Sequence, residues 1–198
     1  MAIDAKLVVA LREKTGAGIV DVKAALDETN GDMAAAEELL RKKGILKAGK
    51  KSDRVAGEGI VYSYIHGNQK VGVMVELRCE TDFVARTDGF KQLAHDIAIH
   101  IAAMNPLYLD ESEVPPELAE KEREFYKEEL KAANKPEEMI AKIVEGKLAK
   151  FYTDVCLMKQ AFVKDENMTI EDLVKSGIAK MGENIQMKRF VRFHLGQE

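Results

Sequence analysis

The chain has 198 residues, of which 46% are hydrophobic and 32% are charged, and a formal net charge of −4 at pH 7. These values are typical of a globular protein with one or two domains, and the net negative charge argues against general nucleic-acid binding by the whole molecule. No apolar run approaches the roughly 20 residues of a membrane span, and the N-terminus lacks the pattern of a signal peptide. Two cysteines, Cys79 and Cys156, do not form a disulfide framework, so we expect a reducing, cytoplasmic location.

The first 45 residues predict a small module of three short helices. Residues 15–18 (Thr-Gly-Ala-Gly) and 29–31 (Thr-Asn-Gly) interrupt three runs in which apolar residues recur at helical spacing. Asp32 is placed to cap the third helix, and Gly44 is expected to end that helix with a positive φ. The apolar runs are Ile3, Leu7, Ala10 and Leu11, then Ile19, Val22 and Leu26, then Met33, Ala36, Leu39 and Leu40.

The Thr-Gly-Ala-Gly segment is interpreted as a tight turn and not as a phosphate-binding loop. No strand is predicted before it, and the Lys-Ser/Thr ending of such loops is missing. Ile19 and Val20 follow this turn and cannot both face a core, because neighbours on a helix point about 100° apart. Val20 is therefore a candidate for exposure. Beyond the module, residues 46–58 are rich in Lys, Gly and Ala and predict a basic linker with some helical character.

Residues 59–80 predict a β-hairpin whose second strand alternates between buried and exposed positions. The alternation stops at Thr81 and Asp82, so Thr81, Asp82, Phe83 and Val84 are expected to form a loop. Because loops run over the surface, we expect Phe83 to be an exposed aromatic at the end of a rigid strand, where it can probe a partner's pocket. The alternative is that Asp82 caps or turns the chain while Phe83 folds back onto the core. The strand's apolar positions are Val71, Val73, Val75, Leu77 and Cys79.

Two further patterns complete the predicted core. A long amphipathic helix ends at Asn105-Pro106, and its apolar positions are Phe90, Leu93, Ala94, Ile97, Ala98 and Ile101. A last helix opens near Thr169, and a closing strand follows it, which we expect to be the third of an antiparallel sheet. In that strand, one side is expected to alternate with Gln186, Lys188, Phe190, Arg192 and His194, and it consists of Ile185, Met187, Arg189, Val191, Phe193 and Leu195.

Residues 110–160 predict a protruding hairpin of two helices with a narrow apolar stripe. The first helix is expected to begin at Pro116, and a break near Gly146 in the second is left open. The sequence therefore predicts an α+β fold with a three-helix module at 1–45 and a linker at 46–58. The core, with its three-stranded antiparallel sheet packed by helices, is expected at 59–109 and 161–198, and the helical hairpin is inserted into it.

Three segments resemble the elongation factor Ts family, the guanine-nucleotide exchange factors of elongation factor Tu. They are residues 77–86 (Leu-Arg-Cys-Glu-Thr-Asp-Phe-Val-Ala-Arg), 11–18 (Leu-Arg-Glu-Lys-Thr-Gly-Ala-Gly) and 180–185 (Lys-Met-Gly-Glu-Asn-Ile). They occur in the family's order and extend over nearly the whole chain, which makes the resemblance specific. It implies that the N-terminal module is similar to a ubiquitin-associated (UBA) domain. It also implies that the helical hairpin is a coiled-coil arm for self-association or for further partner contacts.

The resemblance also implies a function that is not enzymatic. The protein would bind elongation factor Tu with GDP and promote GDP release, so that GTP can bind. Asp82 and Phe83, flanked by Thr81 and Val84, would disturb the partner's Mg²⁺ and phosphate site, with Phe83 acting as a wedge. Other positions that match partner-binding residues of the family are Arg12, Ile19, Val20, Lys23, His66, Met181 and Gly182.

Each of these further positions also has an ordinary interpretation. Arg12 and Lys23 are the kind of charges that most helices expose to solvent. His66 lies in a hairpin turn, where a histidine needs no function. Met181 lies at a helix end, where methionine usually fills the core.

Longer members of the family carry two related copies of the core, whereas this chain contains one hairpin, one Thr-Asp-Phe-Val and one long core helix. We therefore expect a symmetric homodimer built on the core and a 2:2 assembly with elongation factor Tu. Neither cysteine is clearly placed for a crosslink, so the dimer is expected to be noncovalent.

No catalytic, metal-binding or cofactor-binding motif stands out. His95 and His100 are five residues apart and do not share a helix face, and a Cys79–His66 pair lacks a third group to orient it. The competing class of protein is an adaptor whose three-helix module binds ubiquitin-like or peptide ligands. That interpretation leaves Thr-Asp-Phe-Val without a role.

Overall fold

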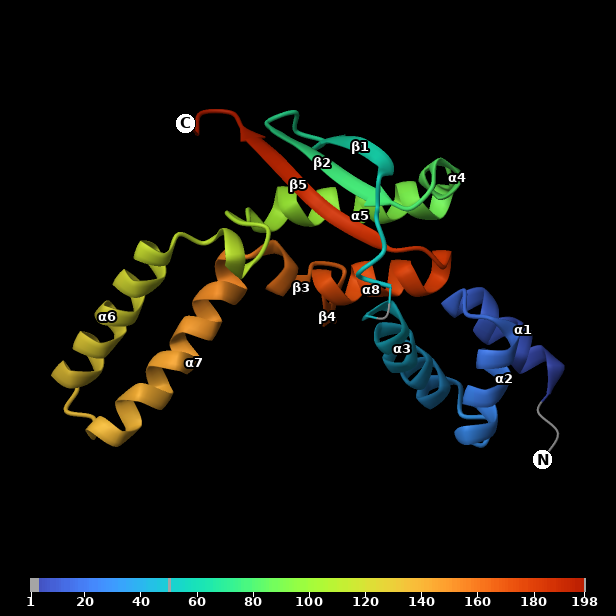
Figure 1. Ribbon diagram of the computed structural model, residues 1–198, viewed down its shortest axis with the longest axis horizontal. Coiled ribbons are helices and arrows are strands. Elements are labelled where there is room, and N and C mark those ends of the chain that lie inside the picture. The colour runs from blue at the N-terminus through green and yellow to red at the C-terminus, as the bar shows by residue number, and fades with distance from the viewer. Residues whose placement is uncertain (1–3, 50, 198) are drawn as a thin grey trace. The chain divides into compact units, whose positions relative to one another are not determined.

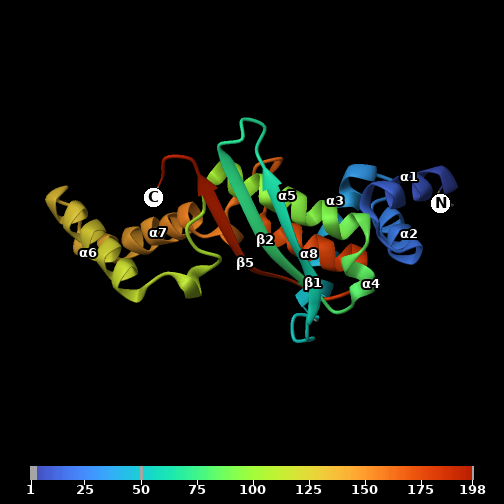
Figure 2. The same cartoon turned by 90° about the horizontal axis from the view of Figure 1, so that it is seen from above.

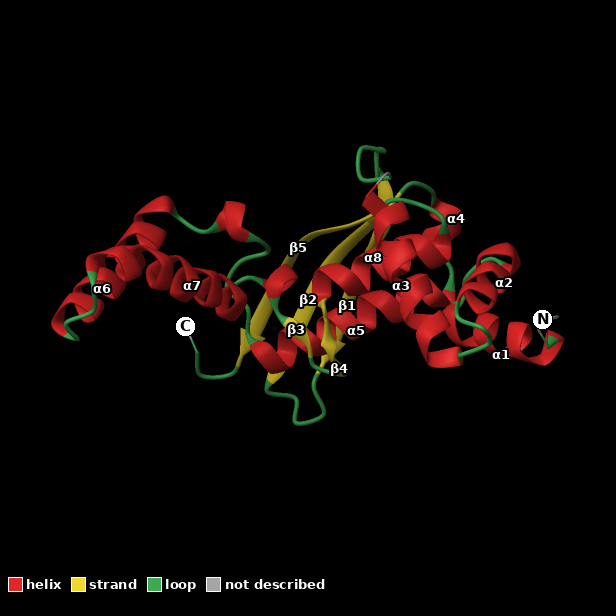
Figure 3. Cartoon of the chain, turned by 90° about the horizontal axis from the view of Figure 1, so that it is seen from below, coloured by secondary structure: helices red, strands yellow, loops and turns green. Residues whose placement is uncertain are grey.

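The structure is a computed structural model that describes residues 4–49 and 51–197, with the side chains of residues 45–47 left out. Its helices and three-stranded antiparallel sheet confirm the predicted α+β class (Figure 3). The expected apolar position Ile3, and Lys50 within the expected linker at 46–58, lie outside the described residues. The chain forms two compact units. One contains the residues up to Tyr62, Glu76–His95 and Asp172–Lys188, and the other contains Ser63–Val75, Asp96–Glu171 and the residues from Arg189 onward.

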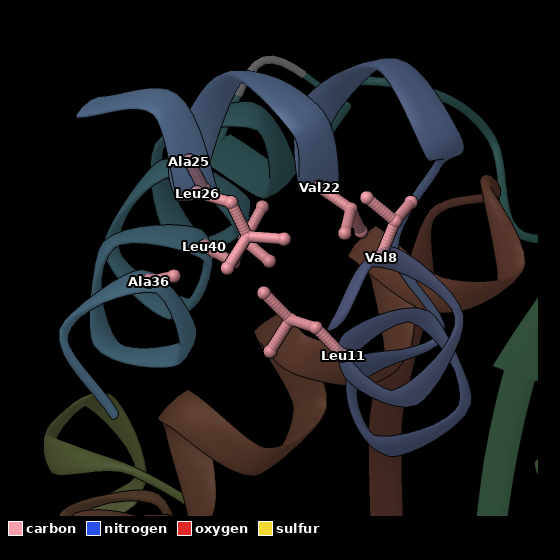
Figure 4. Packing of buried hydrophobic residues seen from close by; sticks show 7 residues of the cluster. All are labelled: Val8, Leu11, Val22, Ala25, Leu26, Ala36 and Leu40. Atoms are coloured by element: carbon pink, nitrogen blue, oxygen red, sulfur yellow. The ribbon is translucent and has the colours of Figure 1, made fainter. Parts of the chain in front are cut away.

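Three helices form the N-terminal module, as predicted: α1 (Ala5–Thr15), α2 (Ile19–Glu28) and α3 (Met33–Gly49). Their buried side chains point toward one another in Figure 4, and partly buried Leu7, Met33 and Leu39 pack around them. Two expected core positions differ, because Ala10 is exposed and Ile19 is 49% exposed. The buried cluster consists of Val8, Leu11, Val22, Ala25, Leu26, Ala36 and Leu40.

The ends of these helices follow the expected local chemistry, with one exception. Asp32 caps α3 because its carboxylate accepts hydrogen bonds from the backbone of Ala34 and Ala35, at 2.9 and 3.0 Å. Gly16 ends α1 in the left-handed conformation, with φ at 67°. The prediction for Gly44 is wrong, because α3 continues through it to Gly49.

The requirement for glycine at position 44 comes from packing and not from the backbone angle. A Cβ atom at Gly44 would lie 3.1 Å from the Cβ atom of Ala179, which belongs to helix α8 (Ile170–Met181). The glycine therefore allows α3 to approach α8 closely. It follows that the first part of the expected linker is the last turn of α3.

The sheet consists of β1 (Glu58–Ile65), β2 (Val71–Cys79) and β5 (Ile185–His194), with β2 in the middle (Figure 2). The predicted alternation of β2 is confirmed, since every odd position from Val71 to Cys79 is buried. Gly59 of β1 has a φ of 149°, and a Cβ atom there would lie 2.2 Å from the carbonyl oxygen of Leu77. A side chain at position 59 would therefore push β1 away from β2.

The closing strand β5 does not keep a single apolar side. Ile185 and Met187 are buried, but the burial pattern shifts by one residue at Lys188 and Arg189, which are both exposed. From there on, the half-buried positions are even, and Arg192 donates hydrogen bonds to the carbonyl oxygen of Ala102 at the end of helix α5. The predicted alternation through Leu195 is therefore wrong beyond Met187. The odd positions in this part of the strand turn away from α5.

Helix α5 (Asp88–Met104) confirms the clearest helical pattern of the sequence. Asn105 follows it with a φ of 49°, and Pro106 comes next, so the chain leaves the helix where predicted. A one-turn segment, η1 (Glu111–Glu113), then leads toward the helical hairpin. All six expected apolar positions are buried, and they are Phe90, Leu93, Ala94, Ile97, Ala98 and Ile101.

The predicted helical hairpin is formed by α6 (Pro116–Ala132) and α7 (Glu137–Val155), which lie side by side (Figure 1). Its seam is narrow, with Leu130, Ile140 and Val144 buried between the helices. Ion pairs flank the seam, including Arg123 with Glu145 and Lys147 with Glu129. Helix α7 runs through Gly146 without a break.

Replacing Gly146 by alanine is expected to stabilise the protein. The position is exposed and helical, and a Cβ atom there would meet nothing within 4 Å, so alanine gains helix propensity without a clash. We expect the free energy of unfolding to rise by about 0.5 to 1 kcal/mol in urea titrations. Gly177→Ala in α8 is the matched control, because its Cβ atom would lie 2.7 Å from Leu93 and should destabilise the protein. A destabilising Gly146→Ala would contradict a continuous α7.

The sequence did not predict a two-stranded antiparallel hairpin of β3 (Ala161–Phe162) and β4 (Asp165–Thr169), which follows the short turn η2 (Leu157–Lys159). These strands are short and mostly polar, so they carry no clear periodicity. His100 lies next to this hairpin and is fully buried. Its Nδ1 atom accepts from the backbone of Val163 at 3.2 Å, so its Nε2 atom must donate to the side-chain oxygen of Gln160 at 2.9 Å.

This arrangement predicts a loss of stability in mild acid. Burial lowers the pKa of His100 below its ordinary 6.5, and protonation of Nδ1 would break the bond from Val163. The unfolded chain therefore binds this proton more tightly than the folded chain does. The contribution of His100 to the free energy of unfolding is fully present above pH 6.5, and it is lost as the pH drops through 6.5 toward the lower pKa of the folded state.

Urea titrations between pH 7.5 and 5 would measure this loss, and NMR titration of the His100 ring would assign it. His66→Gln serves as the control because His66 is exposed, and this variant should keep the same pH dependence. A ring of His100 that titrates at or above 6.5 would rule the explanation out.

Candidate partner-binding site

The Thr-Asp-Phe-Val segment is helical and not the loop predicted from the sequence. Asp82–Ala85 forms a single helical turn, α4, directly after β2. Thr81 is its N-cap, with an extended backbone and a hydroxyl group that accepts from the backbone of Val84 at 3.4 Å. Four residues are too few for a periodic pattern. However, threonine followed by aspartate is a helix-start signal that could have indicated the turn.

Within α4, one side chain is presented to solvent and the next is an anchor. Phe83 is 79% exposed, which excludes the alternative that its ring folds back onto the core. Val84 is only 7% exposed, so its side chain holds α4 in place and is not available to a partner. Asp82 is exposed and pairs with Arg86 at 2.8 Å, a surface contact worth less than about 1 kcal/mol. The carboxylate of Asp82 therefore remains free to exchange partners.

The support of α4 comes from Glu183, about a hundred residues further along the chain. One carboxylate oxygen accepts from the backbone of Glu80 and Thr81, at 3.1 and 3.0 Å. The other accepts from the hydroxyl group of Thr81 at 2.7 Å. Glu183 thus accepts the hydrogen bonds of the backbone N–H groups at the point where β2 ends.

The turn that contains Glu183 also holds the chain that follows α3. Asn184 is 1% exposed, and its amide donates to the carbonyl oxygens of Ser52 and Arg54, at 3.2 and 2.7 Å. Its backbone donates to the carboxylate of Glu80 at 2.6 Å. In addition, the ammonium group of Lys51 donates to the carbonyl oxygen of Gly182 at 2.6 Å. The turn therefore joins the end of β2 to the segment after the N-terminal module.

The predicted partner-binding positions Met181 and Gly182 lie at this turn. Met181 is half-buried, while Gly182 is exposed with a φ of 80°, which favours glycine. The preceding turn of α8 lies against the N-terminal module: a Cβ atom at Gly16 would lie 3.3 Å from the side chain of Lys180. The module, the end of α8 and α4 thus belong to one compact unit.

The predicted positions on the N-terminal module are all accessible. Val20 is 76% exposed, as expected, and Ile19 is 49% exposed, so two apolar side chains stand side by side at the start of α2. Arg12 and Lys23 are exposed, and neither has an ion-pair partner in the described part of the chain. An apolar pair flanked by unpaired cations is a suitable surface for an acidic partner.

His66 is exposed in the turn between β1 and β2 and belongs to the other compact unit. Its Nδ1 atom lies 3.0 Å from the hydroxyl group of Tyr64, which orients the ring. Cys79, which the sequence placed in a conceivable pair with His66, is fully buried, and its thiol donates to the carbonyl oxygen of Thr81 at 3.1 Å. Burial, and then the nearby Glu183 carboxylate, raise the pKa of Cys79. A thiol in this setting is structural and not nucleophilic.

Residues 4–49 and 51–197 offer neither a metal site nor a membrane-spanning helix. They contain no group of three His, Cys, Asp or Glu side chains arranged to hold a metal ion. Nor does any helix within these residues combine the length and the apolar character needed to cross a bilayer.

Comparison with known proteins decides the family. The family described as "Elongation factor TS" matches residues 45–197, which is well over half of the chain. The chain belongs to the elongation factor Ts family. Among its relatives, elongation factor Ts of Fervidobacterium nodosum is 55% identical over 197 residues and is covered completely, as is this chain. The protein of Thermosipho melanesiensis is 54% identical over 98% of this chain and 100% of its own length, and that of Syntrophomonas wolfei is 52% identical over 98% and 91%.

Membership of this family confirms the resemblance stated from three short segments. Sequence reasoning nevertheless missed the residues that hold α4, namely Glu183, Asn184 and Glu80. The first two lie within the Lys-Met-Gly-Glu-Asn-Ile segment that carried the resemblance. A buried asparagine next to a glutamate in a turn was the available signal. Its partners, however, are too distant in sequence to be inferred from it.

Proposed function

We propose that this protein is a guanine-nucleotide exchange factor that binds elongation factor Tu with GDP bound and accelerates the release of GDP. The observation that carries the proposal is the exposure of Phe83 on a helical turn whose base is buried and hydrogen-bonded. Aromatic side chains are enriched at protein–protein interfaces, where a few of them contribute most of the binding energy. Family membership identifies elongation factor Tu as the binding partner.

The proposed mechanism is mechanical and electrostatic. Phe83 inserts between helices of the partner near its Mg²⁺ and phosphate site, while the exposed carboxylate of Asp82 competes with the groups that hold Mg²⁺ and the β-phosphate. In this mechanism, the release of GDP involves no covalent step. If the factor weakens GDP binding by a given ratio, GDP weakens binding of the factor by the same ratio. A coupling of about 3 kcal/mol corresponds to about 150-fold in affinity.

The N-terminal module supplies a second contact in this proposal. Ile19 and Val20 form its apolar centre, and Arg12 and Lys23 flank it as charges without an internal partner in the described chain. Met181 and Gly182 would add to this contact near α4, to which the next residue, Glu183, is hydrogen-bonded, whereas His66 would contact another part of elongation factor Tu. Phe83 would therefore be delivered to its site by a module that binds elsewhere on the GTPase.

The protein is further proposed to act as a noncovalent homodimer that binds two molecules of elongation factor Tu in the cytoplasm. Exposed apolar side chains of β1, β2 and β5, together with Leu195 directly after β5, support this. A group of exposed apolar side chains on one sheet is a candidate protein–protein interface. The exposed side chains, all in one compact unit, are Ile65, Met74, Val191, Phe193 and Leu195.

The test of the exchange function is the release of a fluorescent GDP analogue from purified elongation factor Tu. Adding this protein, with excess unlabelled GDP present, should increase the release rate with a hyperbolic dependence on its concentration. A chelator of Mg²⁺ alone gives the rate of metal loss for comparison. No acceleration at tens of micromolar would refute the proposal and favour the adaptor alternative.

A further inference from the structure

Glu183 holds two backbone N–H groups and one hydroxyl group at the start of α4. Its carboxylate accepts three hydrogen bonds from two consecutive residues, Glu80 and Thr81, at 2.7 to 3.1 Å. We propose that Glu183 is a positioning residue for nucleotide exchange, which keeps Phe83 directed outward by fixing the hydroxyl group of Thr81. This inference rests on the exchange function proposed above. Glu183 itself is half-buried and is not offered as a partner contact.

The direction of one hydrogen bond carries the inference. A hydroxyl group has a single proton to donate and lone pairs that accept, whereas an ionised carboxylate can only accept. Opposite Glu183, the hydroxyl group of Thr81 must therefore donate, and the distance is 2.7 Å. Its lone pair is then directed at the backbone of Val84, which donates to it at 3.4 Å. The carboxylate thus sets the orientation of the N-cap that starts α4.

The backbone of Thr81 is fixed on both sides as well. Its N–H donates to Glu183 at 3.0 Å, and its carbonyl oxygen accepts from the thiol of Cys79 at 3.1 Å. Thr81 therefore has its amide, carbonyl and hydroxyl groups all bound. Phe83 follows two residues later and has no packing of its own, since 79% of it is exposed. The direction in which its ring points is therefore set by the helical turn, which Thr81 and the buried neighbour Val84 hold in place.

Glu183 is held in turn by the residues around it. The backbone of Asn184 donates to the carboxylate of Glu80 at 2.6 Å, and Arg54 approaches the same oxygen at 3.5 Å. The side-chain amide of Asn184 donates to the carbonyl oxygens of Ser52 and Arg54. The ammonium group of Lys51 donates in the other direction, to the carbonyl oxygen of Gly182. A group fixed in this way by hydrogen bonds loses little freedom when it positions another. The turn is therefore a rigid support for α4.

Glu183→Gln is the direct test because it keeps size and removes the second acceptor oxygen. If the amide nitrogen faces the backbone of Glu80 and Thr81, both of their hydrogen bonds are lost, and if it faces the hydroxyl group of Thr81, that bond reverses its direction, so the N-cap of α4 is disturbed in either case. At saturating concentrations of the factor, we expect GDP release from elongation factor Tu to slow about tenfold, since misplacing an inserted group by about 1 Å costs up to a hundredfold. The concentration for half-maximal effect should change less than about twofold, because the surface of the N-terminal module is untouched.

A second measurement needs no partner. The protein contains no tryptophan, so Phe83→Trp introduces a single tryptophan at the tip of α4, which can be excited selectively over the tyrosines. We expect Glu183→Gln to increase the amplitude of its fast anisotropy decay at least about twofold. Glu166→Gln is the matched control, because it removes one exposed carboxylate on β4 and should leave the decay unchanged. Thermal unfolding of each variant, followed by circular dichroism, shows whether the fold is intact.

Thr81 provides the variants that distinguish positioning from general stability. Thr81→Ser keeps the hydroxyl group and should behave as the wild type, whereas Thr81→Val should reproduce the anisotropy and rate changes of Glu183→Gln. Adding Glu183→Gln to Thr81→Val should then slow release less than twofold further, because both act through one hydrogen bond. Full additivity of the two changes would overturn the inference.

The outcomes separate this inference from the proposed function. A wild-type chain that does not accelerate GDP release would refute the exchange function, and with it any role of Glu183 in exchange. If the wild type accelerates release and Glu183→Gln does so equally at saturation, with an unchanged anisotropy decay, the function stands and the positioning role is wrong. If Glu183→Gln does not fold, Thr81→Val supplies the same two measurements.

Discussion

Phe83→Ala is expected to slow the factor-stimulated release of GDP from elongation factor Tu by about 30- to 150-fold. Truncation of a central aromatic contact costs about 2 to 3 kcal/mol, which corresponds to this ratio. The fold should not change, because Phe83 is 79% exposed and α4 is anchored by Val84 and Thr81. The measurement is the release rate of fluorescent GDP at saturating concentrations of the factor, together with the midpoint of urea unfolding.

The matched control is Phe125→Ala on α6. Phe125 is 61% exposed, so its truncation removes a similar amount of apolar surface from water and should leave release unchanged. An equal loss in both variants would mean that the effect is not specific to α4. A Phe83→Ala rate within twofold of the wild type would reject the wedge mechanism while leaving exchange by another surface open to test.

Val191→Asp is expected to convert the dimer to a monomer. The side chain lies on the outer face of β5, 43% exposed, among the apolar groups proposed to meet those of a second copy. A carboxylate placed in the centre of such an interface loses water without gaining a partner. We therefore expect the dissociation constant of the dimer to rise at least about 100-fold. Light scattering during gel filtration should show a mass of two chains for the wild type and of one for the variant.

Val55→Asp is the control for that change. Val55 is 85% exposed in the segment before β1, so the same substitution adds the same charge outside the sheet face and should leave the dimer intact. A monomeric wild type at tens of micromolar would exclude the homodimer. If the wild type is a dimer, the exchange assay on Val191→Asp will show whether two copies are needed for nucleotide release or only for a 2:2 assembly.

The parts of the fold that could be predicted are those with long periodic patterns. Helix α5 buries the six apolar positions expected of it, and β2 buries every odd residue from Val71 to Cys79. In both elements, one face is covered along its whole length, so the period in the sequence matches the period of burial. The exposure of Val20 followed from the angle between neighbours on a helix, whereas that of Phe83 was expected from a surface loop that is in fact a helical turn.

The errors arose where a distant contact decides the local structure. Gly44 suggested a helix end, yet it is needed because α3 lies close to Ala179. The four residues of α4 were too few for a period, and the alternation of β5 was extended across a shift that no local residue signals. The bond between Glu183 and Thr81 joins residues 102 positions apart, a distance over which a single sequence carries no information about pairing.

The shift at Lys188 and Arg189 has a consequence for how this scaffold can change during evolution. The shift in burial at this point makes the second half of β5 present Val191 and Phe193, and the chain after it Leu195, to the solvent instead of to its own helices. A descendant that lost one residue there would keep almost the same composition, but those three side chains would turn inward. In the proposed homodimer, such a one-codon deletion would remove apolar side chains from the face that the two copies share, so it would alter assembly without changing Phe83 or the residues that hold α4.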